Sequence, residues 1–457
     1  MEIQLSLISQ KSREDKGCKF NNLMHLINVE SMRQCYRQLK KGKSPGMDGI
    51  TLEEYGIKLH ENLEGLLDRM KKMSYHPQPV RRTYIPKGNG GKRPLGIPTI
   101  EDKMVQMCFT MVLEAIYESD FLDNSYGFRA GKSCHQALYR IDQSLMFKPV
   151  NYIIDADIKG FFDNVNHGWM KRFLQERISD GKFLRYIMRF LKSGIMEAGK
   201  YEETEQGTPQ GGVISPVLAN IYLHYVIDRW FKQEVEKKSK GYVELVRYCD
   251  DFVILAEKPE EAHGILTVLR KRLLRFGLEL SEEKTRILKF GRRALVEAER
   301  KGDKPETFNF LGFTHYCCRS RAGKYKVSRR TEKKRFSRSC KKIKEYIQKS
   351  RNVAGLEIVW KALSRKLLGH YNYYGVSENF RSLQRFYKEV EVVLMKWLNR
   401  RSQKKSYTWE QFRKYLKRYP LPKPRICKPF YQRISVVNGN EELYAGNPHV
   451  QFCEGGR

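Results

Sequence analysis

Apolar and polar residues follow two different periods along the chain. Short β-favouring runs occupy residues 150–157 and 245–255, which predicts strands, whereas residues 326–351 and 361–390 place apolar side chains three and four positions apart, which predicts helices. No apolar stretch approaches the length of about 18 residues that a membrane-spanning helix needs. The first residues also lack a signal-peptide run, so we expect no secretory leader.

Glycine and proline interrupt this pattern at several joints. The segments KGKSPGMDG (41–49), PKGNGGKRPLGIP (86–98) and GTPQGG (207–212) predict loops, and four prolines between residues 420 and 429 predict the end of helical packing. No repeat of about 20–50 residues is evident, which argues against solenoids and propellers.

Charge changes this picture, because most of it lies at one end of the chain. The 457 residues carry a net charge of +34, of which residues 291–457 contribute +26 and residues 1–290 contribute +8. Such an excess opposes folding by self-repulsion, so it predicts a polyanionic partner, most often nucleic acid. A single basic run is equally well a solvated helix face, but basic runs with interleaved aromatics recur between residues 326 and 420.

The ten cysteines are scattered, and no CxxC pair occurs. A zinc finger or ribbon is therefore not expected. With 40% hydrophobic residues, a chain of this length buries a core without disulfide staples. We expect reduced thiols and a cytosolic protein.

Two pairs of carboxylates stand where the predicted strands end. Asp155 and Asp157 are two positions apart and so face the same side of a strand, while Asp250 and Asp251 lie between two apolar runs, as at the tip of a hairpin. Adjacent carboxylates are costly to bury without partners, and Mg²⁺ prefers carboxylate and phosphate oxygens. Three acids from two strand ends predict two metal ions about 3.5–4 Å apart for in-line phosphoryl transfer. A plain surface turn would explain a lone Asp-Asp pair, but not the second acidic strand end.

Eight segments, in the same order, resemble the reverse transcriptase/maturase proteins encoded by bacterial group II introns. They are GMDGIT (46–51), YIPKGNGGKRPLGIPT (84–99), SYGFRAGKSCHQA (125–137), DADIKGFFDNVNH (155–167), EQGTPQGGVISPVLANIYLH (205–224), RYCDDFVIL (247–255), LELSEEKTRI (278–287) and FNFLGFTH (308–315). The resemblance extends from about residue 25 to about residue 430.

The resemblance implies an α+β, right-hand polymerase with fingers, palm and thumb. We expect residues 1–145 to form an N-terminal extension and the fingers, part of which returns within residues 170–240. The palm, an antiparallel sheet that carries the catalytic aspartates, is expected in residues 146–318. A helical thumb of the maturase type is expected in residues 319–402, and a short basic extension in residues 403–457.

The resemblance also implies RNA-templated DNA synthesis from deoxynucleoside triphosphates with two Mg²⁺ ions, which Mn²⁺ can replace. Asp157, Asp250 and Asp251 match the catalytic aspartates, and the backbone carbonyl of Ile158 is a further expected metal ligand. One ion would lower the pKa of the primer 3′-hydroxyl, and the other would hold the triphosphate. Asp155 matches no catalytic position, so we expect a structural acid.

Other matching positions imply contacts with the incoming nucleotide. Lys87 and Arg93 match residues that clasp the triphosphate, and Gln210 matches a residue lining the nucleotide pocket. Phe162 matches the aromatic gate that excludes a ribose 2′-hydroxyl, and Lys284 matches a lysine that protonates the leaving pyrophosphate. Plainer alternatives stay open: a solvated basic loop for Lys87 and Arg93, core packing for Phe162 and a surface lysine for Lys284.

One position departs from the family at the centre of its motif. Cys249 stands where group II relatives usually have Ala, between Tyr248 and the aspartate pair. Cys is small and apolar enough to fit, so we expect activity to survive, with fidelity or oxidation sensitivity as the properties open to change. FNFLGF (308–313) resembles the primer-grip hairpin, although its aromatics would also suit an ordinary core.

Residues 320–400 resemble the maturase thumb, which in relatives grips the intron RNA and the template–primer duplex. We expect its aromatic residues to pack the helices together and its outer basic residues to contact RNA, because A-form RNA is recognised by shape, phosphates and 2′-hydroxyls. The candidates for RNA contact are Lys333, Lys334, Arg335, Lys341 and Lys342.

The implied partners are a group II intron RNA, an RNA template with a DNA primer, deoxynucleoside triphosphates and target DNA. After Pro429 the chain has one His, His449, and one Cys, Cys453, too few for the HNH endonuclease of many relatives. A DNA primer would then come from elsewhere, such as a replication-fork strand. We expect a cytoplasmic ribonucleoprotein in a bacterium with no membrane partner, and the sequence leaves the oligomeric state open.

Two other functions compete with this interpretation. The first is a splicing cofactor that binds RNA without polymerising, against which the intact Asp157, Asp250 and Asp251 argue. The second is a related reverse transcriptase of phage defence or mutagenic retrohoming. The PQGGVISP motif (209–216) and the maturase-like thumb favour the intron-encoded type.

Overall fold

The computed structural model describes residues 2–86, 91–197, 200–202, 206–207, 211–350, 355–400 and 407–431. The chain divides into two compact units. The first comprises the residues up to Phe128 together with Gln136–Ser328, and the second comprises Arg129–His135 together with the residues from Arg329 onward.

Helices make up most of both units. The α-helices in the described segments are α1 (Glu2–Glu14), α2 (Val29–Gln38), α3 (Leu52–Ile57), α4 (Leu59–Lys71), α5 (Ile100–Tyr117), α6 (Cys134–Phe147), α7 (His167–Gln175), α8 (Gly181–Leu191), α9 (Ser215–Leu223), α10 (Glu236–Lys238), α11 (Pro259–Arg275), α12 (Arg292–Lys301), α13 (Lys333–Ser350), α14 (Leu356–Tyr374), α15 (Phe380–Leu398) and α16 (Trp409–Arg418). Short 3₁₀ turns are η1 (Met24–Leu26) and η2 (Phe161–Asp163), and π-helical turns are η3 (His224–Asp228) and η4 (Phe231–Val235).

The strands are short, and they form three sheets within the described residues. They are β1 (Val80–Pro86), β2 (Lys92–Ile97), β3 (Tyr152–Asp157), β4 (Ile195–Glu197), β5 (Lys200–Glu202), β6 (Val243–Tyr248), β7 (Asp251–Ala256), β8 (Arg286–Lys289), β9 (Thr307–Phe310), β10 (Phe313–Arg319) and β11 (Tyr325–Thr331).

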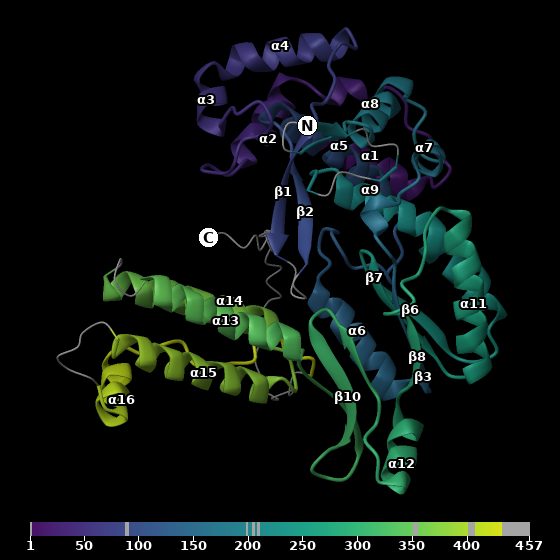
Figure 1. The fold of residues 1–457 in the computed structure, drawn as a ribbon. Helices are drawn as coiled ribbons and strands as arrows, with labels where there is room; N and C mark the ends of the chain where they lie inside the picture. Colours follow the sequence, from purple (N-terminus) through teal and green to yellow (C-terminus); the bar gives the residue numbers. More distant parts are fainter. Residues whose placement is uncertain are drawn as a thin grey trace, which may run out of the picture. The chain divides into compact units, whose positions relative to one another are not determined.

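The sheet in the middle of the first unit has the order β6-β7-β3-β8, and each neighbouring pair is antiparallel (Figure 1). Its two central strands are strongly apolar: Ile153, Ile154 and Ile254 are fully buried. Helix α11 packs against β3 and β7, and Ser144 of α6 donates a hydrogen bond to Glu244 of β6. The predicted strands and the predicted hairpin around the aspartate pair are confirmed.

Two smaller sheets complete the strand arrangement. One has the order β2-β1-β4-β5, with a parallel β1–β4 pair and otherwise antiparallel pairs. The other has the order β11-β10-β9. A two-residue turn joins β9 and β10, with φ of 49° at Leu311 and 80° at Gly312. Positive φ at both central residues is what a type I′ hairpin requires.

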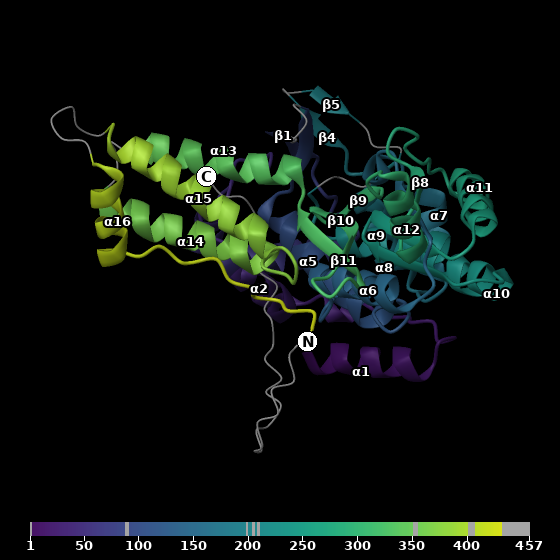
Figure 2. The ribbon, with the colours of Figure 1, turned by 90° about the horizontal axis from the view of Figure 1, so that it is seen from below.

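Helices bury most of the remaining core. Helix α5 is apolar around most of its circumference, and it packs against α1, α2 and α9. In the second unit, α13, α14 and α15 lie side by side in both Figure 1 and Figure 2 and share an apolar core.

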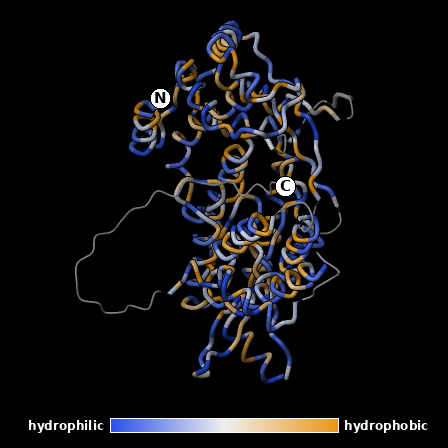
Figure 3. The backbone as a smooth tube through the Cα atoms, turned by 90° about the vertical axis from the view of Figure 1, so that its left-hand side faces the viewer, coloured by the Kyte–Doolittle hydropathy of each residue, from blue (hydrophilic) through white to orange (hydrophobic). Residues whose placement is uncertain are grey.

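Apolar and polar positions alternate along the helices in Figure 3, as expected for amphipathic helices. No helix in the described segments has both the length and the apolar character needed to cross a bilayer.

The predicted helix over residues 326–351 begins later than expected. Residues 325–331 form β11, a neighbour of β10, and α13 starts at Lys333. The prediction is wrong for residues 326–332, of which 326–331 lie in β11, because this strand pairs with β10 and buries Val327, Ser328, Arg329 and Thr331. The predicted end of helical packing at the prolines is confirmed, since no helix follows α16 in the described residues up to 431.

Candidate active site

The three aspartates that matched the family motif meet at one edge of the central sheet. Asp157 is the last residue of β3, and in the antiparallel register it stands directly opposite Asp251, the first residue of β7. Asp250 lies one residue earlier, in the turn between β6 and β7. The sheet therefore brings together carboxylates that are about 90 residues apart in the sequence.

The turn that carries Asp250 is a two-residue hairpin connection. Tyr248 pairs with Asp251, which leaves Cys249 and Asp250 as its central residues. Cys249 has a φ of 58°, the left-handed conformation that costs a residue with a Cβ about 1–2 kcal/mol. The Cys249 side chain is 3% exposed, and burial raises the pKa of its thiol. A buried, protonated thiol is a poor nucleophile.

A buried guanidinium holds this turn from inside. The Arg247 side chain is fully buried and is paired with Asp228 of η3, Nε to Oδ1 at 2.8 Å. It also donates to the Asn220 side chain at 3.1 Å, to Ser125 Oγ at 2.7 Å and to the backbone carbonyl of Cys249 at 3.0 Å. Arg247 thus connects α9, η3 and the SYGF segment to the backbone of the turn that carries Asp250.

The electrostatics of the site are those of crowded carboxylates. Loss of solvation, followed by the charges of Asp250, Asp155 and Asp157, raises the pKa of Asp251 to about 7. A hydrogen bond from the backbone of Leu311, in the β9–β10 turn, acts in the opposite direction. The hairpin that resembles the primer grip therefore contacts the edge of the sheet where the aspartates meet.

A lysine occupies part of this edge. Lys284 Nζ lies 2.7 Å from Asp157 Oδ2, and both side chains are partly exposed. No three Asp, Glu, His or Cys side chains of the described residues are placed as a ready set of metal ligands. The donor chemistry nevertheless fits a hard divalent cation, because neighbouring carboxylates raise the pKa of Asp251 and such repulsion is relieved when a cation binds between them.

Asp155 faces a different partner. Its Oδ2 lies 3.6 Å from Arg286 Nε of β8, and Arg286 also donates to the backbone carbonyl of Thr307 in β9. Loss of solvation raises the pKa of Asp155 to about 6, although Arg286 lowers it. These contacts link β3, β8 and β9, as a structural acid would.

Two of the predicted nucleotide-binding residues lie beside the aspartates in the chain. Ile158 is buried and follows Asp157 directly. Phe162 lies in η2, half-buried, with its ring 5.2 Å from that of Phe161. The backbone of Gly207, at φ 89°, passes so close to the Phe162 carbonyl that a Cβ would stand 2.8 Å from it, so Gly207 lies beside the predicted gate.

The side chains of three other predicted nucleotide-binding residues are not described by the structure. Lys87 and Gln210 lie outside the described residues, and only the backbone of Arg93, in β2 opposite Ile85, is described. Gly211 contacts the backbone of Gly96 in β2, since a Cβ would meet the Gly96 carbonyl at 2.6 Å. Gly211 therefore adjoins β2, the strand that carries Arg93.

The predicted RNA-binding residues form a basic face on α13 in the second unit. Lys333, Lys334, Arg335, Lys341 and Lys342 are all exposed. Two of them make local ion pairs, Arg335 with Glu332 at 3.7 Å and Lys341 with Glu345 at 3.8 Å. Such exposed pairs are weak, so they leave the face available to phosphates.

The residues that support the turn are not predicted by the sequence. Arg247 was present in the RYCDD motif, but nothing in the sequence connects it with Asp228 or Asn220. A charged residue inside an otherwise apolar strand run was the available signal, because a buried charge needs a partner.

Comparison with known families defines the class of this site. The family described as "Reverse transcriptase (RNA-dependent DNA polymerase)" matches residues 85–315, half of the chain, and the match contains all three aspartates. The chain is therefore a reverse transcriptase, a member of a divalent-metal-dependent class of polymerases with a mixed α+β polymerase fold.

The second match narrows the family. "Group II intron, maturase-specific domain" matches residues 336–416. The "Group II intron-encoded protein LtrA" of Lactococcus lactis subsp. cremoris is 30% identical, across 86% of this chain and 76% of that protein. "Protein YkfC" of Escherichia coli K12 is 33% identical across 60% of this chain and 81% of that protein. The chain belongs to the group II intron-encoded reverse transcriptases, which combine reverse transcription with assistance to splicing; no HNH domain was found in these 457 residues.

Proposed function

We propose that Asp157, Asp250 and Asp251 are the catalytic aspartates and that, with the backbone carbonyl of Ile158, they bind two Mg²⁺ ions, for which Mn²⁺ can substitute. The observation that carries this proposal is the register that sets Asp157 opposite Asp251, with Asp250 beside them. Bound ions would lower the pKa of the primer 3′-hydroxyl and neutralise the triphosphate. The protein holds the carboxylates together at one edge of the central sheet, and Arg247 stabilises the turn there by donating a hydrogen bond to the Cys249 carbonyl.

The remaining residues receive roles in substrate handling. Phe162, beside the aspartates, selects deoxynucleotides by crowding a ribose 2′-hydroxyl, and Gln210 lines the same pocket. Lys87, which lies between β1 and β2 in the chain, and Arg93 of β2 clasp the triphosphate as a point charge and a forked guanidinium. Lys284 protonates the leaving pyrophosphate, and its contact with the Asp157 carboxylate supports this role.

On the scale of domains, the chain forms the fingers, palm and thumb of a right-hand polymerase. Residues 1–145 form the N-terminal extension and fingers, with a return within 170–240, and residues 146–318 form the palm. Residues 319–402 form the maturase thumb and 403–457 a basic extension. The sheet that carries the aspartates supports the palm assignment, and the helices α13–α15 support that of the thumb.

The partners follow from the charge and from the family. The basic face of α13 binds the intron RNA, which is also the template for DNA synthesis from a DNA primer at target DNA. The relation to a bacterial intron-encoded protein supports a ribonucleoprotein in the bacterial cytoplasm. The net charge of +34 supports a polyanionic partner.

Primer extension on an RNA template tests the catalytic assignment. The wild-type protein with Mg²⁺ and deoxynucleotides should extend the primer, and Asp250→Ala should abolish extension while RNA affinity stays within about twofold, because a ligand is removed but the basic surface is not. Asp303→Ala, which removes an exposed aspartate, is the matched control and should extend normally. Extension by Asp250→Ala would overturn the assignment. A folded wild-type protein that binds RNA but never extends would favour a splicing-only cofactor.

A further inference from the structure

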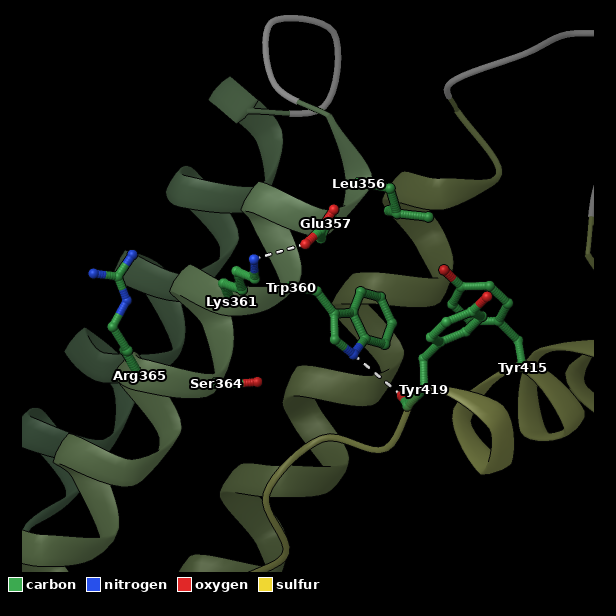
Figure 4. A pocket seen from close by; sticks show the side chains of 8 residues that line it. All are labelled: Leu356, Glu357, Trp360, Lys361, Ser364, Arg365, Tyr415 and Tyr419. Atoms are coloured by element: carbon green, nitrogen blue, oxygen red, sulfur yellow. Dashed lines mark hydrogen bonds and ion pairs between the residues drawn. The ribbon is translucent and has the colours of Figure 1, made fainter.

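A cavity of about 720 Å³ opens in the second unit between α14 and α16 (Figure 4). This volume lies in the range of about 300–1,000 Å³ that is typical of small-ligand sites. The lining residues are Leu356, Glu357, Trp360, Lys361, Ser364, Arg365, Tyr415 and Tyr419. None of them belongs to the catalytic edge, so the cavity is a separate feature.

One side of the cavity is a wall of aromatic rings. The Trp360 ring meets Tyr415 edge-on, with centroids 5.4 Å apart and an interplanar angle of 83°, and the Tyr415 and Tyr419 centroids are 5.0 Å apart. Trp360 Nε1 donates a hydrogen bond to the backbone carbonyl of Tyr419 at 3.1 Å, which fixes the indole against the end of α16. The Tyr419 side chain stays 45% exposed. The wall is therefore rigid yet accessible, as a stacking platform needs to be.

The other side of the cavity is polar and basic. In Figure 4, Lys361, Ser364 and Arg365 lie along α14 on the side away from the tyrosines. The acid of the lining, Glu357, is paired with Lys361 at 2.6 Å, so its charge is balanced locally. Arg365 is exposed and forms no ion pair within the described part of the chain. Its guanidinium is available to a ligand that brings negative charge.

More cations surround the aromatic wall. Helix α16 carries four basic residues and one acid, Glu410, which is paired with Lys414 at 2.8 Å. Arg418 lies over the Tyr419 ring, 5.6 Å from its centroid. Aromatic faces with cations on both flanks match the chemistry of a nucleotide, in which a base stacks and its phosphates pair with Lys and Arg.

We propose that this cavity captures an unpaired base of an RNA strand. The bases of a duplex are already stacked on both faces, so only a loop, bulge or single-stranded end can supply a free face to the rings. The hydroxyls of Ser364, Tyr415 and Tyr419 provide hydrogen-bonding groups for a base edge or a 2′-hydroxyl. The inference rests on the proposed RNA-binding function of the thumb. It adds that the cavity selects RNA with an unpaired base.

Fluorescence anisotropy with the full chain and two RNA hairpins tests the proposal. One hairpin carries a short single-stranded overhang with 2-aminopurine, and the other is fully paired. Tyr419→Ala should weaken binding of the overhang probe about 10-fold, the effect of removing the stacking of one base. Binding of the paired probe should change by less than about twofold. Tyr419→Phe should retain the stacking and most of the affinity.

Control variants separate stacking from general damage. Phe380→Ala removes another exposed aromatic residue of the same unit, one that does not line the cavity, and should leave both affinities unchanged. Arg365→Gln should weaken binding of the overhang probe more than Lys396→Gln, which removes an exposed cation of α15. Thermal unfolding of each variant confirms that the fold is retained.

The outcomes distinguish this inference from the proposed function. Equally weakened binding of both probes, or unchanged binding of the overhang probe by Tyr419→Ala, would overturn the base-binding site while RNA binding by the wild type stands. If Tyr419→Ala weakened binding only of a hairpin with a single-stranded DNA overhang, the proposal that the cavity binds RNA would be overturned. A wild-type protein that binds neither RNA probe would overturn the proposed function itself.

Discussion

Gly127 and Cys249 meet where the SYGF segment passes beneath the turn that carries Asp250. A Cβ at Gly127 would stand 2.5 Å from the backbone nitrogen of Cys249 and 3.0 Å from the carbonyl carbon of Tyr248. Both are backbone atoms, so they can move away from a Cβ only if the whole turn shifts. The position of Asp250 therefore depends on the absence of a single methyl group.

Gly127→Ala should reduce nucleotide addition by at least about 10-fold, because displacement of a reacting group by about 1 Å costs up to about 100-fold in rate. The matched control is Gly264→Ala on α11, where the new methyl group meets nothing within 4 Å and should stabilise the helix by up to about 1 kcal/mol. Single-nucleotide extension rates and thermal unfolding measure the two effects. A normal rate for Gly127→Ala would contradict the dependence on this close approach.

Cys249, the departure from the family pattern, is explained by the same turn. The position needs a small side chain because it is buried, and Cys and Ala both satisfy this need. Burial raises the pKa of the Cys249 thiol and so disfavours the thiolate that oxidants attack; we therefore predict little oxidation at this position in the folded protein.

At the scale of elements, the Arg247–Asp228 pair joins the β6–β7 hairpin, which carries Asp250 and Asp251, to a π-helical turn. Both side chains are fully buried, so the pair is a poor source of stability but costly to break. Its hydrogen bond to the Cys249 carbonyl gives it a second effect, on the position of the aspartates.

Two variants separate these effects. Asp228→Leu should destabilise the protein by about 3–5 kcal/mol, because it leaves a buried guanidinium without its carboxylate. Asp228→Leu combined with Arg247→Met should recover most of that stability but still add nucleotides slowly, since the Cys249 carbonyl then has no donor from residue 247. Denaturant unfolding and single-turnover rates provide the comparison. A double variant with the wild-type rate would mean that the pair is structural alone.

Helix α14 contains a group whose titration opposes folding. The His370 ring stacks on Phe386 with centroids 3.8 Å apart, its Nε2 has no hydrogen-bond partner among the described residues, and burial lowers its pKa to about 4. Between pH 6.5 and pH 4 the unfolded chain therefore binds more protons at this residue than the folded chain does.

The free energy of unfolding should fall as the pH decreases through that window, by about 3 kcal/mol at most from this group. His370→Phe should flatten the slope in this pH range, because the replacement keeps the ring and cannot be protonated. His263→Gln, at an exposed site on α11, is the control and should leave the slope unchanged. Denaturant unfolding at a series of pH values measures it, and an unaltered slope in His370→Phe would refute the assignment.

At the scale of the whole molecule, charge is the dominant feature. The net charge is +34, most of it in residues 291–457, and α13 presents five of the basic residues as an exposed face. Binding to RNA through such a face releases counterions, so its contribution is visible as a dependence on salt.

Neutralising Lys333, Lys334 and Arg335 together should weaken RNA binding. The slope of log affinity against log salt should decrease by about 0.7–0.9 for each phosphate that the protein no longer neutralises. Neutralising three exposed lysines of the first unit, Lys237, Lys240 and Lys271, is the matched control and should change the slope less. Equal slopes in the two triple variants would mean that the α13 face is merely solvated.

Much of this protein follows from its sequence. The paired apolar runs and the acids at their ends predicted the strands β3, β6 and β7, because a strand has a period of two and a hairpin needs only a short turn. The order of eight motifs identified the family, and the asymmetry of charge predicted a polyanionic partner. These features depend on neighbouring residues, or on the order of motifs and charges along the chain, so the sequence alone is enough to predict them.

Other features depended on the tertiary structure. The pairing of Arg247 with Asp228, the approach of Gly127 to Cys249 and the contact of the Leu311 turn with Asp251 join residues far apart in the chain. Sequence periodicity cannot encode such pairings, because they depend on how whole elements pack. For the same reason β11 appeared helical in the sequence: its partner strand, and not its own residues, decided its conformation.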